Sequence, residues 1–142
     1  MTESDIKPLN WAPIPGVGFT VVRRADGGMN IVFTDVSHVT LTHWRDFAME
    51  HLLNSDRLTR NLYDLRQVEE LPEEAIRYAV EANMDPSVRN IRLAVVLSSE
   101  KVRQAVREIA AQAVAPGGVE MALFTDIDQA EAWLARPLTQ LV

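Results

Sequence analysis

Short runs of polar side chains that follow apolar segments are the residues best placed to do chemistry in this chain. They occur at three points: Asp64 and Arg66, Ser98 and Ser99, and Thr125 and Asp126. If the preceding segments are parallel strands, these groups meet at the sheet edge where α/β proteins bind ligands. The sequence therefore predicts a binding crevice or a partner surface at that edge. The alternative is that Asp64 pairs with Arg66 or a backbone amide and that the hydroxyls and Asp126 only cap helices.

A second candidate is a negative segment over residues 67–74. It contains Glu69, Glu70, Glu73 and Glu74. Glu73 and Glu74 follow a proline and lie in the expected first turn of a helix, where the helix dipole favours carboxylates. The four glutamates form either a constitutive partner surface or an ordinary complement to that dipole, and we place Asp64 and Arg66 beneath them as a brace.

The sequence lacks the residue patterns that a hydrolase active site or a metal site would need. All three histidines lie between residues 38 and 51, and Ser98 lacks the flanking glycines of a nucleophile elbow. His43, Asp46 and Glu50 can share one helix face, but they lack an established metal-binding spacing. The absence of cysteine removes thiol chemistry and thiolate ligands. We expect no catalytic residue, no metal and no cofactor.

Composition limits the partners. The 142 residues, 47% hydrophobic and 24% charged, are typical of one globular domain. A net charge of −6 disfavours nucleic acid. The longest apolar run, residues 93–97, is too short to cross a membrane, and the acidic first residues do not resemble a secretory signal. We expect a cytoplasmic protein without a membrane span.

Proline and glycine mark the ends of the domain. Residues 1–18 contain three prolines and two glycines and are predicted to form an extended arm. Trp11 and Ile14 would be buried against the arm's own domain or against a second subunit, and we hypothesise a homodimer through this arm. The domain covers residues 19–136, and residues 137–142 form a tail.

Hydrophobic periodicity predicts a single α/β domain in the order ββαβαβαβα. We expect strands at 19–24 and 30–33 around an Asp-Gly-Gly turn, and further strands at 61–65, 91–97 and 120–124. The expected helices begin after a cap at Thr42, at Pro72, after Ser98 or Ser99, and around residues 125–128. Short connections imply a mostly parallel sheet of four to five strands with the first strand antiparallel at one edge. The 91–97 strand should be buried on both faces.

This order and several motifs resemble the STAS domains, the fold of sulfate transporters and anti-sigma-factor antagonists. The chain is also similar to small bacterial STAS-like proteins that are compared with the CRAL-TRIO lipid-binding fold. The resemblance covers residues 19–135 and is carried by NLYDLR (61–66), LPEEA (71–75), RLAVV (92–96) and FTDIDQAEAWL (124–134). Anti-sigma-factor antagonists are switched by phosphorylation of a serine or threonine after the Asp-bearing strand. No such residue lies between Asp64 and Pro86, so the switch does not carry over.

Two functions follow as expectations. The first is a non-enzymatic regulatory or protein-interaction module whose protein partner the sequence does not identify. The second, implied by the CRAL-TRIO comparison, is a small carrier that holds an apolar or lipid-like ligand between the sheet and its helices. A core of this size leaves little room for the ~300 Å³ that ligand pockets usually need.

Overall fold

The alternation of strand and helix patterns produces one mixed sheet with helices on both of its faces. The computed structural model describes residues 11–51, 60–84, 92–112 and 120–136, so much of the arm (1–10) and the tail (137–142) lie outside the described residues. The strands are β1 (Phe19–Arg23), β2 (Met29–Phe33), β3 (Arg60–Asp64), β4 (Arg92–Val96) and β5 (Glu120–Phe124). The helices are α1 (His38–His51), α2 (Glu73–Met84), α3 (Glu100–Gln112) and α4 (Ile127–Leu134). The predicted order is confirmed.

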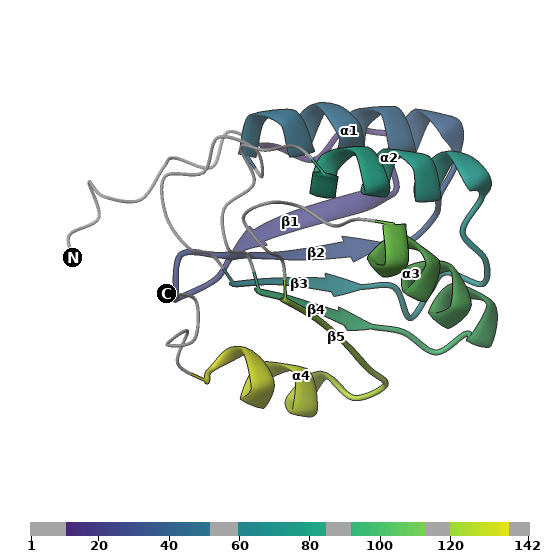
Figure 1. Ribbon diagram of the computed structural model, residues 1–142. Coiled ribbons are helices and arrows are strands. Elements are labelled where there is room, and N and C mark those ends of the chain that lie inside the picture. Colours follow the sequence, from purple (N-terminus) through teal and green to yellow (C-terminus); the bar gives the residue numbers. More distant parts are fainter. Residues whose placement is uncertain (1–10, 52–59, 85–91, 113–119, 137–142) are drawn as a thin grey trace.

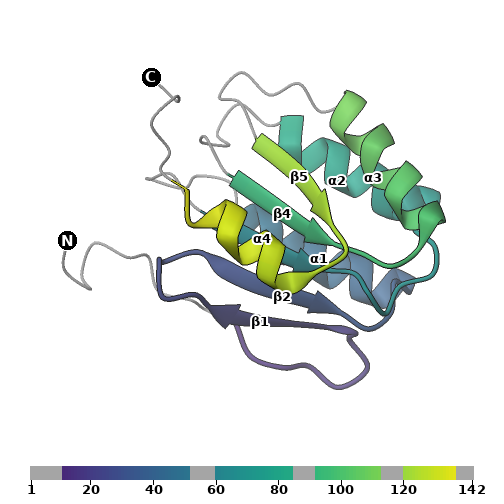
Figure 2. The ribbon, with the colours of Figure 1, turned by 90° about the horizontal axis from the view of Figure 1, so that it is seen from below.

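Chain order and strand order coincide in this sheet. The strands lie in the order β1-β2-β3-β4-β5, with β1 antiparallel to β2 and every other pair parallel. Right-handed crossovers that all advance in one direction place their helices on one face. Accordingly, α1, α2 and α3 cover one face, and α4 lies on the other (Figures 1 and 2). The predicted mostly parallel sheet with an antiparallel edge strand is confirmed.

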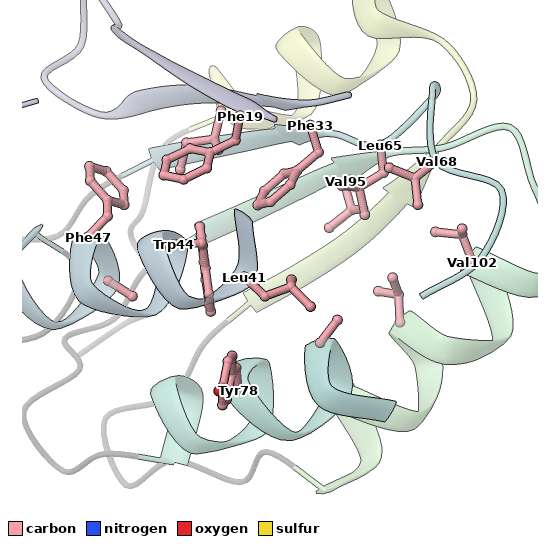
Figure 3. Packing of buried hydrophobic residues seen from close by; sticks show 14 of the residues in the cluster. Phe19, Phe33, Leu41, Trp44, Phe47, Leu65, Val68, Tyr78, Val95 and Val102 are labelled. Carbon is pink, nitrogen blue, oxygen red and sulfur yellow. The ribbon is translucent and has the colours of Figure 1, made fainter. Parts of the chain in front are cut away.

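The main core lies between the sheet and α1–α3. Phe19 and Phe33 stack with ring centroids 5.5 Å apart, and Phe47 of α1 packs against Phe19. Leu41 and Trp44 extend from α1 toward the sheet, as Figure 3 shows. Trp44 and Phe47 are spaced by three residues, so they lie on the same face of α1, and both are buried in this core.

A smaller core lies beneath α4. Leu62, Ala94 and Val96 of the sheet pack against Ala130 and Leu134 of the helix. All five residues of β4 are buried because the strand has helices on both sides. The prediction of a strand buried on both faces is confirmed.

Two arginines of the strand region contact α4 and the residues that follow it. Arg92 is only 2% exposed, and it donates to the Arg136 carbonyl at 2.7 Å, to Glu120 at 3.2 Å, and lies over the Trp133 ring. Arg24 of the hairpin makes two hydrogen bonds to Glu131, at 2.8 and 2.9 Å. Charged groups thus compensate for the small apolar area beneath this helix.

Helix α1 begins earlier than predicted. It starts at His38, so the predicted cap at Thr42 is wrong, and Thr42 lies inside the helix. The first turn is held by Asp35, whose Oδ1 accepts from the Ser37 amide at 3.0 Å and the Thr40 hydroxyl at 2.6 Å. The Thr40 hydroxyl also accepts from the Gly18 amide at 2.8 Å. These bonds join residues that the helical pattern alone does not connect.

The other helix starts agree more closely with the sequence. The Ser99 hydroxyl accepts from the Val102 amide at 3.3 Å, so Ser99 rather than Ser98 caps α3. Asp126 caps α4 by accepting from the Asp128 amide at 2.7 Å. The Pro72 carbonyl accepts the first bond of α2, from Ile76 at 3.2 Å, which places the proline one residue before the helical position predicted for it.

The hairpin turn and the arm complete the domain. Gly27 has a φ of 92°, which the predicted Asp-Gly-Gly turn requires. Trp11 packs on Phe19 of its own domain, with ring centroids 5.9 Å apart, while Ile14 remains 40% exposed. The homodimer through the arm stays a prediction.

No helix in the described parts of the chain is both long and apolar enough to cross a membrane.

Candidate functional site

The carboxyl end of β3 carries a bidentate ion pair. Arg66 donates from Nε to Asp64 Oδ1 at 2.9 Å and from a terminal nitrogen to Oδ2 at 2.7 Å. The Arg66 amide also donates to Asp64 Oδ1, at 3.1 Å. The guanidinium hydrogen bonds hold the pKa of Asp64 below its usual range despite partial burial. The pair folds the chain tightly as it leaves the strand.

The two serines after β4 hold the loop that follows β3. The Ser98 hydroxyl donates to the Arg66 carbonyl at 2.8 Å, and the Ser99 hydroxyl donates to the Glu69 carbonyl at 2.6 Å. Their hydroxyls therefore bind backbone between Asp64 and α2. Ser98 thus contacts a carbonyl and not a histidine in the described residues, an arrangement without a nucleophile–base pair.

The end of β5 completes this edge of the sheet. Thr125 and Asp126 are exposed, and Asp126 caps α4. The charge of Asp126 contributes to raising the pKa of Arg66, although the larger cause is the hydrogen bonding to Asp64. The structure thus brings Asp64, Arg66, Ser98 and Asp126 to one edge, as the strand order predicts.

The four glutamates divide into two groups. Glu69, Glu70 and Glu73 are exposed, and we call these three residues the acidic surface. Glu74 is half-buried, because its Oε2 contacts His38 Nδ1 at 2.7 Å and accepts from the Tyr78 hydroxyl at 3.4 Å. Glu74 therefore joins α2 to α1, a contact across 36 residues of sequence that sequence reasoning missed.

An open groove of about 680 Å³ continues from the acidic surface along α2 and α3. It is lined by Glu73, Ile76, Arg77, Val80, Glu81, Glu108 and Gln112. The groove thus combines apolar side chains with more carboxylates than cations. Glu73 belongs both to the groove and to the acidic surface.

The core between the sheet and α1–α3 contains an apolar cavity of about 110 Å³ that is only partly enclosed. Its lining includes Trp44, Tyr63 and Ile109. Trp44 Nε1 donates to the Tyr63 hydroxyl oxygen at 3.2 Å. Burial raises the pKa of Tyr63 strongly, so its phenol is neutral in this environment. Sequence patterns located the individual core residues but gave no sign of the space between them.

The histidines do not form a metal site in the described residues. His38 contacts Glu74, and no group of three or more His, Asp or Glu side chains comes together in the described ranges. His43, Asp46 and Glu50 share α1, as the spacing implies, without such a grouping.

Comparison with known proteins identifies the architecture. No protein-family model and no curated protein matches the chain. A solved structure does match: an uncharacterised protein of the DUF3478 family with a SpoIIAA-like fold, from Shewanella loihica. The TM-score is 0.53, and the match covers 88% of this chain and 98% of the other at 18% identity.

The chain has a SpoIIAA-like fold. This is the STAS-like architecture that the motifs predicted, and at this level of identity the likeness shows the fold alone. Glu69 and Glu70 lie in the loop after β3, and Glu73 is the first residue of α2.

Proposed function

We propose that this protein is a non-enzymatic, cytoplasmic regulatory module that binds a protein partner through the acidic surface. The observation that carries the proposal is the way the Glu69 backbone is held. Its carbonyl accepts a 2.6 Å hydrogen bond from Ser99, while its side chain is exposed. The loop is fixed and its carboxylates remain available, which lowers the ordering cost of binding.

The neighbouring candidate residues support the loop. Asp64 binds Arg66, and Ser98 binds the Arg66 carbonyl. Their polar groups are therefore used to shape the loop. We propose that they position the acidic surface, which is the bracing role expected for Asp64 and Arg66.

The proposed surface is constitutive. A phosphorylated serine or threonine changes the local charge by about −1.5 to −2, whereas a carboxylate is always charged near neutral pH. Because residues 64–86 contain no serine or threonine, the negative charge of this region is fixed by sequence. We propose that the partner surface is basic and that its binding weakens as ionic strength rises.

A matched pair of variants tests this function. Glu69→Gln/Glu70→Gln/Glu73→Gln removes the acidic surface, and Asp46→Asn/Glu100→Gln/Asp128→Asn removes the same charge from exposed positions elsewhere. Affinity enrichment from the source cell, quantified by mass spectrometry, should recover a partner with the parent and the second variant but not with the first. Equal recovery with all three proteins would mean that the glutamates only complement the α2 dipole.

A second function has its own supporting observation, the apolar cavity between the sheet and α1–α3. We propose it as a carrier site. Its volume of about 110 Å³ is below the ~300 Å³ of typical ligand pockets, so it accommodates a small molecule within the core, and a lipid chain would extend beyond it. Native mass spectrometry of freshly purified protein tests for a retained small molecule, and a ligand-free mass throughout would count against this function.

A further inference from the structure

The cavity wall is almost entirely hydrocarbon. On the sheet side it is formed by residues such as Leu93 and Val95, and on the helix side by residues such as Ala75 and Val106. Among the described residues the lining is otherwise aliphatic or aromatic, and it includes Trp44, Tyr63 and Met121. Apart from the Met121 thioether, the polar side-chain atoms of this set are Trp44 Nε1 and the Tyr63 hydroxyl.

The hydrogen bond between these two residues leaves one donor unused. An indole N–H can only donate, so Trp44 is the donor and the Tyr63 oxygen is the acceptor. The Tyr63 hydroxyl therefore still has its own proton to donate. In the described parts of the chain, the hydroxyl accepts from Trp44 and makes no hydrogen bond as a donor.

The environment strengthens this unused donor. Accepting a hydrogen bond polarises a hydroxyl and makes it a better donor, and the effect is larger where the dielectric is low. Burial raises the Tyr63 pKa, so the proton stays on the oxygen at neutral pH. Tyr63 is partly buried, and a donor shielded from water without an acceptor carries a desolvation cost that a ligand oxygen would remove.

The cavity volume limits the ligand's size. An apolar cavity of ~150 Å³ in another protein stays dry and holds benzene or xenon. At about 110 Å³, this cavity suits a ligand of roughly five or six non-hydrogen atoms. A fatty acyl chain would exceed this volume and would have to extend out of the cavity, which is only partly enclosed.

We infer that the cavity binds a small, uncharged and mostly apolar molecule with one acceptor oxygen, such as a ketone, ester or ether, and that the Tyr63 hydroxyl donates to that oxygen. The inference rests on the carrier function proposed above and specifies its ligand. Trp44 is a positioning residue in this site, because it acts through the oxygen of Tyr63.

Two probes of matched shape test the inference: cyclopentanone, and methylenecyclopentane, in which CH₂ replaces the carbonyl oxygen. Binding is followed by NMR of labelled methyl groups, including those of Val106 and Ile109. Both probes should shift these methyls in the parent protein. Tyr63→Phe should weaken the binding of cyclopentanone by about two- to tenfold, the range expected for one hydrogen bond. The affinity for methylenecyclopentane should stay within about twofold of the parent value.

The carbonyl infrared band gives a readout that does not depend on affinity. Bound cyclopentanone should absorb at lower frequency in the parent than in hexane, and this shift should shrink in Tyr63→Phe. If that variant does not fold, the band in the parent alone decides: a hexane-like frequency overturns the inference. Ala79→Leu fills the cavity and should abolish binding of both probes; unchanged binding would place the probes elsewhere and overturn it too.

The outcomes separate the inference from the carrier function. If both probes bind but Tyr63→Phe changes neither their affinity ratio nor the carbonyl band, the cavity is a carrier site and the role of Tyr63 is wrong. If neither probe shifts the cavity methyls, the carrier function and the inference both fail.

Discussion

Asp64 and Arg66 form a two-bond ion pair, at 2.9 and 2.7 Å, between a nearly buried carboxylate and a half-exposed guanidinium. The carboxylate accepts the Arg66 amide as well. Two residues that are separated by one position therefore set the direction in which the chain leaves β3. The loop that carries Glu69 and Glu70 starts from this point.

Replacing Asp64 should destabilise the domain. Asp64→Asn removes the charge-assisted pair and should lower the free energy of unfolding by about 1–3 kcal/mol. The cost stays below that of a fully buried pair because Arg66, with 46% of its side chain exposed, is rehydrated by solvent. Urea denaturation at neutral pH measures the difference.

The same pair predicts a pH dependence. Because the folded-state pKa of Asp64 is lowered, its contribution is present above the unfolded value of ~3.9 and is lost as pH falls through the folded value. The stability gap between the parent and Asp64→Asn should therefore narrow as the pH falls from about 5 to 2. If the difference in unfolding free energy between the two proteins stays constant over this range, the Asp64–Arg66 pair does not cause the pH dependence.

A close approach of two backbone segments makes Gly28 sensitive to substitution. A Cβ at Gly28 would lie 1.6 Å from the Arg60 carbonyl oxygen, whereas a Cβ at Gly16 would meet nothing within 4 Å. Gly28→Ala should cost about 2 kcal/mol or more, since the backbone of β3 must move. Gly16→Ala introduces a side chain at a positive φ but in open space, so it should cost only the backbone strain of about 1 kcal/mol. Equal melting temperatures for the two variants would contradict the close approach of the Gly28 and Arg60 backbones.

A buried position in β4 and an exposed position in β1 should respond very differently to the same substitution. Val95 is 5% exposed and Val22 is 61% exposed, although both are strand residues. Val95→Asp puts a carboxylate into the apolar core and should cost several kcal/mol, enough to unfold the domain. Val22→Asp should change stability by less than about 0.5 kcal/mol. Circular dichroism melts of both proteins test the assignment, and a cooperative, parent-like melt for Val95→Asp would refute it.

Sequence patterns predicted the parts of the fold where the spacing of apolar residues along the chain matches their burial in the folded protein. The apolar run of β4 reflects burial on both faces, and Val102, Ala105, Val106 and Ile109 follow the buried stripe of α3. The sequence pattern predicts a start of α1 five residues too late, after Thr42 instead of at His38. Its first turn depends on Asp35 and Gly18, which contact Thr40 through the folded structure. Ala110, which is also apolar and follows Ile109 directly, is exposed, so an apolar residue in α3 is not enough to predict burial.

The candidate site was predictable only in part, for a related reason. Strand order brings Asp64, Ser98 and Asp126 to one sheet edge, and parallel topology follows from the alternation of elements. The separation of Glu74 from the other glutamates depends on its contact with His38, a residue of another helix. The cavity depends on small mismatches among side chains from several elements, and no one-dimensional pattern records them.

Photo-crosslinking in the source cell tests the central claim most directly. A photoreactive amino acid at exposed Gln67 lies beside the acidic surface and leaves its three glutamates intact, while the same residue at exposed Asp46 on α1 is the control. The proposed function predicts a discrete cross-linked protein from position 67 that is absent from position 46 and is lost when Glu69, Glu70 and Glu73 are changed to glutamine. The claim would be contradicted by the same products from both positions, or by a cross-link at position 67 that persists without the glutamates.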